Sequence, residues 1–274
     1  MLHIGLFFVD IVTLSHVLEP RLCGLDAVYL DLGGLYDSEV LAQNRGELEA
    51  AKRKNAACYP LCTLALQSAA AASDGLHKIA AAALPPAVLQ EAKGRLLPPL
   101  LPARRGPGTV LRRFVTAISP KGLLSLPLPV SRVFVFRDSY RLSAALLGQI
   151  CADYKAAGHL VVCGFDPLHP GQASAVLVPE LDVGYCASSR LFPLADGTAP
   201  WLDLDALVSE HLSYERQQQL EAFEQLRAAG LQQAITHLRE AKRHHDALEA
   251  ACRPAVDFTR LDEQIEAILT TLEG

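Results

Sequence analysis

The sequence predicts an α/β protein in which helices flank a parallel sheet and long helices are appended to it. Two observations lead to this fold class. Short apolar runs rich in β-branched residues alternate with a helical segment between residues 133 and 186. Long stretches with leucine or alanine at helical spacing lie before residue 84 and after residue 203.

The first of three zones, residues 1–84, opens with an apolar run from Leu2 to Leu14. This run lacks a positive leader and a small-residue cleavage site, contains Asp10, and is too short to cross a bilayer. We therefore expect a buried strand at Ile4–Val9. A helical region should follow from about Ser38, and no other segment approaches transmembrane length, so no membrane association is expected.

The second zone, residues 85–108, is dense in residues that interrupt helices. It contains Pro85-Pro86, Pro98-Pro99, Pro102 and Gly106-Pro107-Gly108. Such punctuation is typical of a connector. Gly106-Pro107-Gly108-Thr109 resembles the core of a phosphate loop, but no Gly-Lys follows it, so we interpret it as part of the connector.

The third zone, residues 109–274, carries the sheet and then long helices. Its near-continuous apolar runs are typical of strands that are covered on both faces. The expected strands are Val133–Phe136, Leu160–Cys163, Ala175–Val178 and Val183–Cys186, and the expected helix between the first two is Leu142–Ala157. After Asp203, apolar residues recur at helical spacing, which indicates packing stripes.

Composition excludes several classes of function. The chain has 274 residues, half of them hydrophobic, and a net charge of −5, which argues against a nucleic-acid-binding protein. Its seven cysteines show no paired zinc-site spacing, so we expect reduced thiols in a cytoplasmic protein. His237 and His244-His245-Asp246 lack the i, i+4 histidine pair of a helical metal site, so no metal site is expected.

The segment from Val133 to Ile150 has the order of a phosphate-binding loop: a buried strand, a tight loop and an opening helix. A Walker A loop, G-x-x-x-x-G-K-[ST], needs glycines, a lysine for the phosphates and a hydroxyl for Mg²⁺. Here Arg137 and Leu142 replace the glycines, Ser143 the lysine and Ala144 the hydroxyl. The candidate nucleotide-binding residues of this degenerate loop are Arg137, Asp138, Ser139, Tyr140, Arg141, Leu142, Ser143 and Ala144, with Lys121 as a further cation.

The first and third zones repeat one another. Leu30-Asp31-Leu32 matches Leu202-Asp203-Leu204, and Leu48-Glu49-Ala50 matches Leu220-Glu221-Ala222, at the same separation along the chain. This separation, from Leu30 to Leu202, is called the repeat interval. Asp74 and Leu76 match Asp246 and Leu248 at the repeat interval, and Leu2-His3-Ile4-Gly5 echoes Leu181-Asp182-Val183-Gly184 after a small shift. We interpret this as an internal duplication whose first unit lacks its front half.

Several stretches resemble an uncharacterised bacterial family of tandem P-loop ATPase-like proteins, common in spore-forming Firmicutes. The stretches that carry the resemblance, over most of the chain, are His16 to Glu19-Pro20, Ala117-Ile118-Ser119-Pro120-Lys121-Gly122, Cys163-Gly164-Phe165-Asp166-Pro167 and Pro179-Glu180-Leu181. The resemblance implies a P-loop NTPase-like fold and, in intact members, ATP with Mg²⁺. In this chain the loop has lost its Walker A residues, and Ala187 stands where the family has an aspartate.

We therefore expect a shortened, degenerate member of that family that binds or scaffolds a partner without hydrolysing nucleotide, as a homodimer or with another protein. One alternative is an ATPase or phosphotransferase with a non-standard loop, in which Lys121, Asp166 and Glu180 would act; Asp166 and Glu180 are the candidate catalytic carboxylates, since they follow predicted strands. The other is a piece of a longer tandem ATPase whose P-loop precedes Met1.

Overall fold

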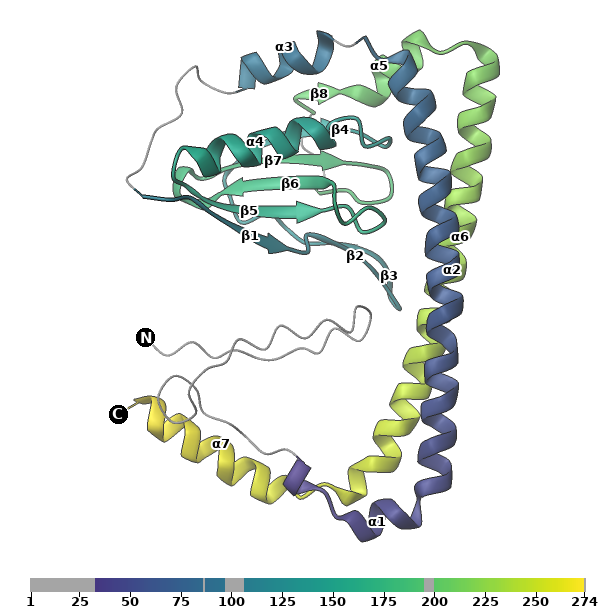
Figure 1. Ribbon diagram of the computed structural model, residues 1–274, viewed down its shortest axis with the longest axis vertical. Helices are drawn as coiled ribbons and strands as arrows, with labels where there is room; N and C mark the ends of the chain where they lie inside the picture. Colours follow the sequence, from purple (N-terminus) through teal and green to yellow (C-terminus); the bar gives the residue numbers. More distant parts are fainter. Residues whose placement is uncertain (1–32, 86, 97–105, 195–199, 274) are drawn as a thin grey trace. The chain divides into compact units, whose positions relative to one another are not determined.

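The computed structural model describes residues 33–85, 87–96, 106–194 and 200–273 (Figure 1). The chain divides into two compact units, one of residues 54–243 and the other of residues 1–53 with 244–274. The first is called the sheet unit and the second the terminal unit, and each is described by itself.

The sheet unit contains a mixed six-stranded sheet. In spatial order its strands are β1 (Thr109–Arg113), β5 (Leu160–Phe165), β6 (Ala173–Val178), β7 (Val183–Ser188), β4 (Arg132–Arg137) and β8 (Leu202–Asp203). Every neighbouring pair is parallel except the two that involve β6. A hairpin of β2 (Thr116–Ser119) and β3 (Gly122–Ser125) forms a separate small sheet.

The predicted α/β class and the four strands predicted between residues 133 and 186 are confirmed, but the prediction of a wholly parallel sheet is wrong at β6. Only Asp166 to Gln172 joins β5 to β6, and only Pro179 to Asp182 joins β6 to β7. A parallel connection needs a dozen or more residues, so these short links force antiparallel pairing.

Helix α4 (Ala144–Ala156) packs on the sheet and covers the main core. It lies along one face of the sheet and buries Leu147, Ile150 and Tyr154 there (Figure 1). The Tyr154 hydroxyl lies 2.8 Å from the hydroxyl of Tyr185 in β7, so two otherwise isolated polar groups satisfy one another inside the core. Helix α5 (Leu204–His211) adds Leu204 and Val208 to the same core.

The predicted connector at 85–108 contains a helix, α3 (Ala87–Leu96). Its apolar side chains recur at helical spacing, and Ala92 and Leu96 are buried in the main core with Val88 and Leu89 packed against it. Pro85 precedes the helix and does not interrupt it. Tertiary packing therefore decides the conformation of this stretch; residues 97–105 of the connector lie outside the described residues.

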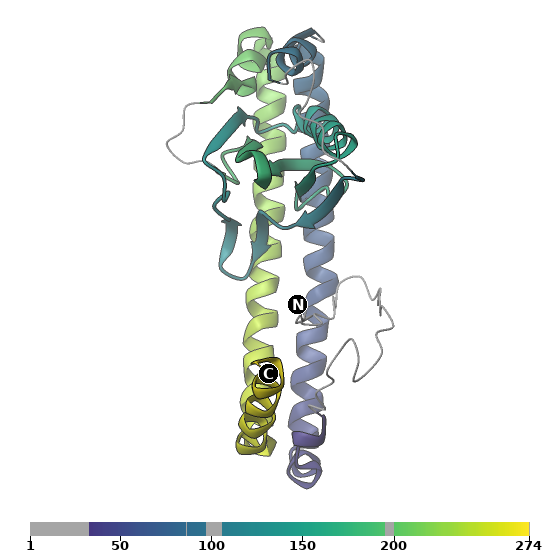
Figure 2. The ribbon, with the colours of Figure 1, turned by 90° about the vertical axis from the view of Figure 1, so that its left-hand side faces the viewer.

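Two helices of 39 residues, α2 (Arg45–Ala83) and α6 (Tyr214–Cys252), confirm the predicted long helices. Within the sheet unit their residues 54–83 and 214–243 run antiparallel and side by side (Figure 2). Small residues allow this close approach, because a Cβ on Gly230 would lie 2.9 Å from the carbonyl oxygen of Ala65. Cys58 and Cys62 share the buried face of α2, as their spacing predicts.

The terminal unit contains η1 (Gly33–Leu35), α1 (Ser38–Gln43), η3 (Arg253–Ala255) and α7 (Phe258–Glu273) with the adjoining ends of α2 and α6. The Asp37 carboxylate caps α1 by accepting the N–H groups of Glu39 and Val40. Tyr36 and Val256 form an antiparallel bridge. The strand predicted at Ile4–Val9 lies outside the described residues, and none of the described helices has the length and apolar character to cross a membrane.

Candidate functional site

The loop between β4 and α4, residues 138–143, is the candidate site. It follows the carboxyl end of β4, at the edge of the sheet where the other parallel strands β1, β5, β7 and β8 also end. Ligands of α/β sheets bind at this edge, and the N–H groups that open the following helix attract anions. The predicted frame of strand, loop and helix is therefore present.

The carboxylate of Asp138 occupies the inside of this loop. Its Oδ1 accepts the backbone N–H of Tyr140 at 3.1 Å, and its Oδ2 accepts both the N–H and the hydroxyl of Ser143 at 2.7 Å. Asp138 is 3% exposed. An internal anion thus takes the amide groups that a phosphate-binding loop offers to its ligand.

A second carboxylate holds the next residue of the loop. Asp205 of α5 accepts the N–H and the hydroxyl of Ser139, both at 2.7 Å. Burial is the largest influence on Asp205 and raises its pKa, aided by the negative charges of Asp138 and Asp203, while the bonds from Ser139 act in the opposite direction. The two carboxylates therefore accept three backbone N–H groups of this short loop, those of Ser139, Tyr140 and Ser143.

The long helices bind the carbonyl groups of the same loop. Arg227 of α6 donates to the carbonyl of Ser139 at 3.0 Å, and His77 Nδ1 of α2 donates to the carbonyl of Tyr140 at 3.0 Å. Arg227 is buried, which lowers the pKa of its guanidinium despite the neighbouring charge of Glu224. The loop is thereby held from both helices as well as from α5.

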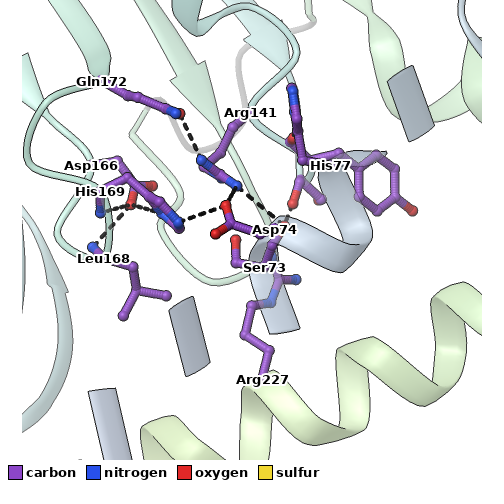
Figure 3. A network of polar contacts seen from close by, with 11 residues as sticks. Ser73, Asp74, His77, Arg141, Asp166, Leu168, His169, Gln172 and Arg227 are labelled. Carbon is purple, nitrogen blue, oxygen red and sulfur yellow. Dashed lines mark hydrogen bonds and ion pairs between the residues drawn. The ribbon is translucent and has the colours of Figure 1, made fainter. Parts of the chain in front are cut away.

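Arg141 is the centre of a polar network that Figure 3 shows. Its backbone has a φ of 61°, in the left-handed region that favours glycine. Its guanidinium donates to Gln172 Oε1 at 2.7 Å, to Asp74 Oδ1 at 2.7 Å and to the Ser73 carbonyl at 3.2 Å. These contacts join the loop to α2 and to the turn between β5 and β6.

Asp74, His169 and Asp166 continue the network. His169 lies between two carboxylates, with Nε2 at 3.0 Å from Asp74 Oδ1 and Nδ1 at 3.3 Å from Asp166 Oδ1 (Figure 3). Burial by itself would raise the pKa of Asp74, but the hydrogen bonds and positive charge of Arg141 and His169 together hold it below its ordinary value. The charges of the network are thus paired with one another.

The space beside the loop is small. A cavity of about 40 Å³, room for roughly three water molecules, is lined by Asp138, Arg141, Asp166 and Ala187 among others. Thr116 Oγ1 and Ser174 Oγ are buried beside it without a hydrogen-bond partner within the described part of the chain. A nucleoside triphosphate cannot enter this space without displacing the loop's own contacts.

Of the remaining predicted residues, Asp166 and Ala144 line the cavity beside the loop, and the others lie elsewhere in the sheet unit. Arg137 ends β4 and pairs with Asp203 at 2.9 Å. Lys121 lies in the exposed turn of the β2–β3 hairpin, on a different sheet from the loop. Asp166 follows β5 at the edge of the loop, where its Oδ1 accepts the N–H groups of Leu168 and His169. Leu142 is buried in the main core, and Ala144 begins α4.

Glu180 lies at the opposite edge of the sheet from the loop. It follows β6, which runs antiparallel to its neighbours, so the end of β6 is at the edge where β5 and β7 begin. There Glu180 Oε2 lies 3.1 Å from Nδ1 of the buried His159. The structure therefore separates the two predicted candidate carboxylates, Asp166 and Glu180.

The residues present do not fit Mg·ATP. The N–H groups of Ser139, Tyr140 and Ser143 are bound to Asp138 and Asp205, and Ala187 lines the cavity where the resemblance implies a carboxylate. No group of three or more metal-ligating side chains lies together within the described ranges. The residues that sequence reasoning missed are Asp74, His77, His169, Gln172, Asp205 and Arg227. Of these, only Asp74 carried a signal, through its match with Asp246.

Comparison of the chain with protein-family models, with curated proteins and with solved structures finds no match. A fold alone does not imply an activity, so function is argued from the site.

Proposed function

We propose that this protein is a non-hydrolysing binding or scaffold protein that keeps a P-loop NTPase-like frame. One observation carries the proposal: the Asp138 carboxylate accepts the N–H groups of Tyr140 and Ser143 within the loop. A triphosphate would have to displace this carboxylate and would then lie beside the charges of Asp138, Asp166 and Asp205. Repulsion between like charges in a partly desolvated site opposes that exchange.

The proposal includes the internal duplication predicted from the sequence. Helices α2 and α6 have the same length, and α6 begins and ends three residues short of one repeat interval after the start and end of α2. Cys62 and Leu66 pack in one cluster with Ala234 and Leu238, their equivalents one repeat interval later. The helix pair thus brings corresponding residues together, as a duplicated antiparallel pair would. Before the long helices the register of the repeat is different. Asp37 caps α1 and Asp203 caps α5, and these two residues are closer together in the chain than the repeat interval.

Calorimetric titration with millimolar Mg·ATP tests the loss of nucleotide binding. We expect no heat of binding, no rise in melting temperature and no turnover. The alternative, an ATPase or phosphotransferase with a non-standard loop, requires binding that is lost in Arg137→Ala and turnover that is lost in Lys121→Ala or Asp166→Ala. Arg53→Ala, on the exposed surface of α2, is the matched control.

A further inference from the structure

The terminal unit contains an apolar groove of about 480 Å³. It lies between the start of the described chain, the end of α6 and the start of α7. Its apolar lining includes Leu35, Tyr36, Leu248, Cys252, Val256 and Leu261. Of these only Leu35 is buried, and Tyr36 is 46% exposed.

The lining of this groove corresponds to buried residues of the sheet unit. Leu248, Cys252, Val256 and Leu261 follow Leu76, Ala80, Leu84 and Leu89 by one repeat interval. In the sheet unit, Leu76 and Ala80 are fully buried and Leu84 is 9% exposed, and all of them pack in the main core against strands and α4. The duplicated surface is thus covered by an α/β layer in the sheet unit, whereas the described residues of the terminal unit contain no such layer.

Helix α7 continues the open surface. Its apolar residues Leu261, Ile265, Ile268 and Leu269 follow helical spacing, yet Ile265 is 42% and Leu269 50% exposed. Ile268 is the equivalent, one repeat interval later, of Leu96, which is buried in the sheet unit. An apolar face of this kind needs a partner, since about 25 cal/mol is gained for each Å² of apolar surface removed from water.

We propose that residues 1–32 of this chain cover the groove, with the apolar run Leu2–Val9 as the contact. This inference rests on the proposed duplication. It does not depend on the contacts of Asp138 within the loop at residues 138–143. Residues 10–34 join Leu2–Val9 to Leu35, which lines the groove, so the apolar run is tethered to the groove within one chain and has a higher effective concentration there than a separate molecule. Leu2–Val9 contains no aspartate, glutamate, lysine or arginine and is rich in leucine and phenylalanine.

The internal repeat also points to Leu2–Val9 as the segment that covers the groove. After a small shift from the repeat interval, Leu2-His3-Ile4-Gly5 echoes Leu181-Asp182-Val183-Gly184, which enters β7, and Val183 packs in the core that buries Leu76 and Ala80. A second copy of the chain is the poorer occupant. The described residues hold one α/β layer, and its matching surface is already covered by its own α2 and α3.

Cys252 lines the groove and reports on its occupancy. The experiment measures alkylation of Cys252 by N-ethylmaleimide, resolved by peptide mass spectrometry, in the full-length protein. We expect Cys252 of the wild type to react at least tenfold more slowly than in the urea-unfolded chain. The double variant Phe7→Asp/Phe8→Asp should remove most of this protection. Leu64→Asp, an equivalent change at an exposed position of α2, should leave it intact.

Three results would overturn the proposal. Wild-type Cys252 that reacts as fast as the unfolded chain means an open groove. Protection that survives Phe7→Asp/Phe8→Asp in a folded protein means a different occupant within the chain, and protection that falls on dilution means a second copy. If the double variant fails to fold, the alkylation rate of Cys252 in the wild type and its dependence on protein concentration still test the proposal. Mg·ATP binding, which tests the proposed function, affects none of these results.

Discussion

Asp138 and Ser143 stand at opposite ends of one loop and are joined by two hydrogen bonds of 2.7 Å, one to the backbone N–H of the serine and one to its hydroxyl. Both residues are almost fully buried. The pair fixes the turn from β4 into α4 without any ligand. The stability of the main core should therefore depend on this carboxylate.

Replacing Asp138 by alanine should lower the free energy of unfolding by about 2–4 kcal/mol, because it leaves the buried donors of Tyr140 and Ser143 without an acceptor. Asp138→Asn keeps one acceptor oxygen and should cost less. Urea unfolding followed by circular dichroism measures both. Asp262→Ala, at an exposed position of α7, is the control and should change stability by less than about 0.5 kcal/mol. An Asp138→Ala protein as stable as this control would contradict the prediction.

Asp205 should make stability fall as pH rises. Burial raises its pKa in the folded state above the unfolded value, so the stability it contributes is fully present below the unfolded pKa and is lost as pH rises through the folded pKa. Asp205→Asn keeps an oxygen for the Ser139 N–H and adds an amide that can donate to the Ser139 hydroxyl.

The stability of Asp205→Asn relative to wild type should therefore increase from about pH 4 to about pH 7. Asp205→Ala, which loses both hydrogen bonds, should be destabilised by about 1–3 kcal/mol. Urea unfolding across this pH range checks both variants. A relative stability of Asp205→Asn that stays flat or falls with pH would show that the native carboxylate is not penalised.

The pair of Arg141 and Asp74 should show measurable coupling in a double-mutant cycle. Because Asp74 is 55% exposed, the interaction energy should be about 1 kcal/mol and should decrease in high salt. The pKa of Asp74 is lowered, so the stability it contributes is present at neutral pH and is lost as pH falls through the folded pKa. Arg45 and Glu49, an exposed pair on α2, provide the comparison and should couple less. Zero coupling at low salt would refute the role of this ion pair.

Gly108 and Gly148 should respond oppositely to alanine. A Cβ on Gly108 would collide with the carbonyl of Lys155 and lie 2.8 Å from that of His159, so Gly108→Ala should destabilise the protein by about 1–3 kcal/mol. Gly148 is inside α4, and a Cβ added to it would have no neighbouring atom within 4 Å, so Gly148→Ala should stabilise the helix by about 0.5–1 kcal/mol. Thermal unfolding of the two variants tests this difference, and a destabilised Gly148→Ala would count against the packing described for α4.

Periodicity was enough to predict strands β4 and β5 and the long helices, because the apolar residues of these two strands are all buried or half-buried and α4 buries its large apolar side chains. It was not enough for the direction of β6, which depends on the length of its links, or for α3, which depends on core contacts that proline-rich flanks conceal. Strand direction also decided the position of Glu180 relative to the loop.

The loop at residues 138–143 could be placed from sequence, and the substitutions at its Walker A positions could be read directly. The partners of the loop could not. Asp205 and Arg227 are 66 and 88 residues from Ser139 in the chain and reach it only through the packing of α5 and α6. Single charged residues on helices give no pattern that separates a buried contact from a solvated face.

The order of strands in the sheet has a consequence for aggregation. Among the described residues, its two edge strands are β1 and β8, and edge strands with free backbone groups can recruit strands from other chains. β8 is only two residues long, and β1 ends in the adjacent, exposed arginines Arg112 and Arg113. A short edge and a positively charged edge both discourage further pairing, so the sheet is protected against growth by strand addition even though half of the chain is hydrophobic.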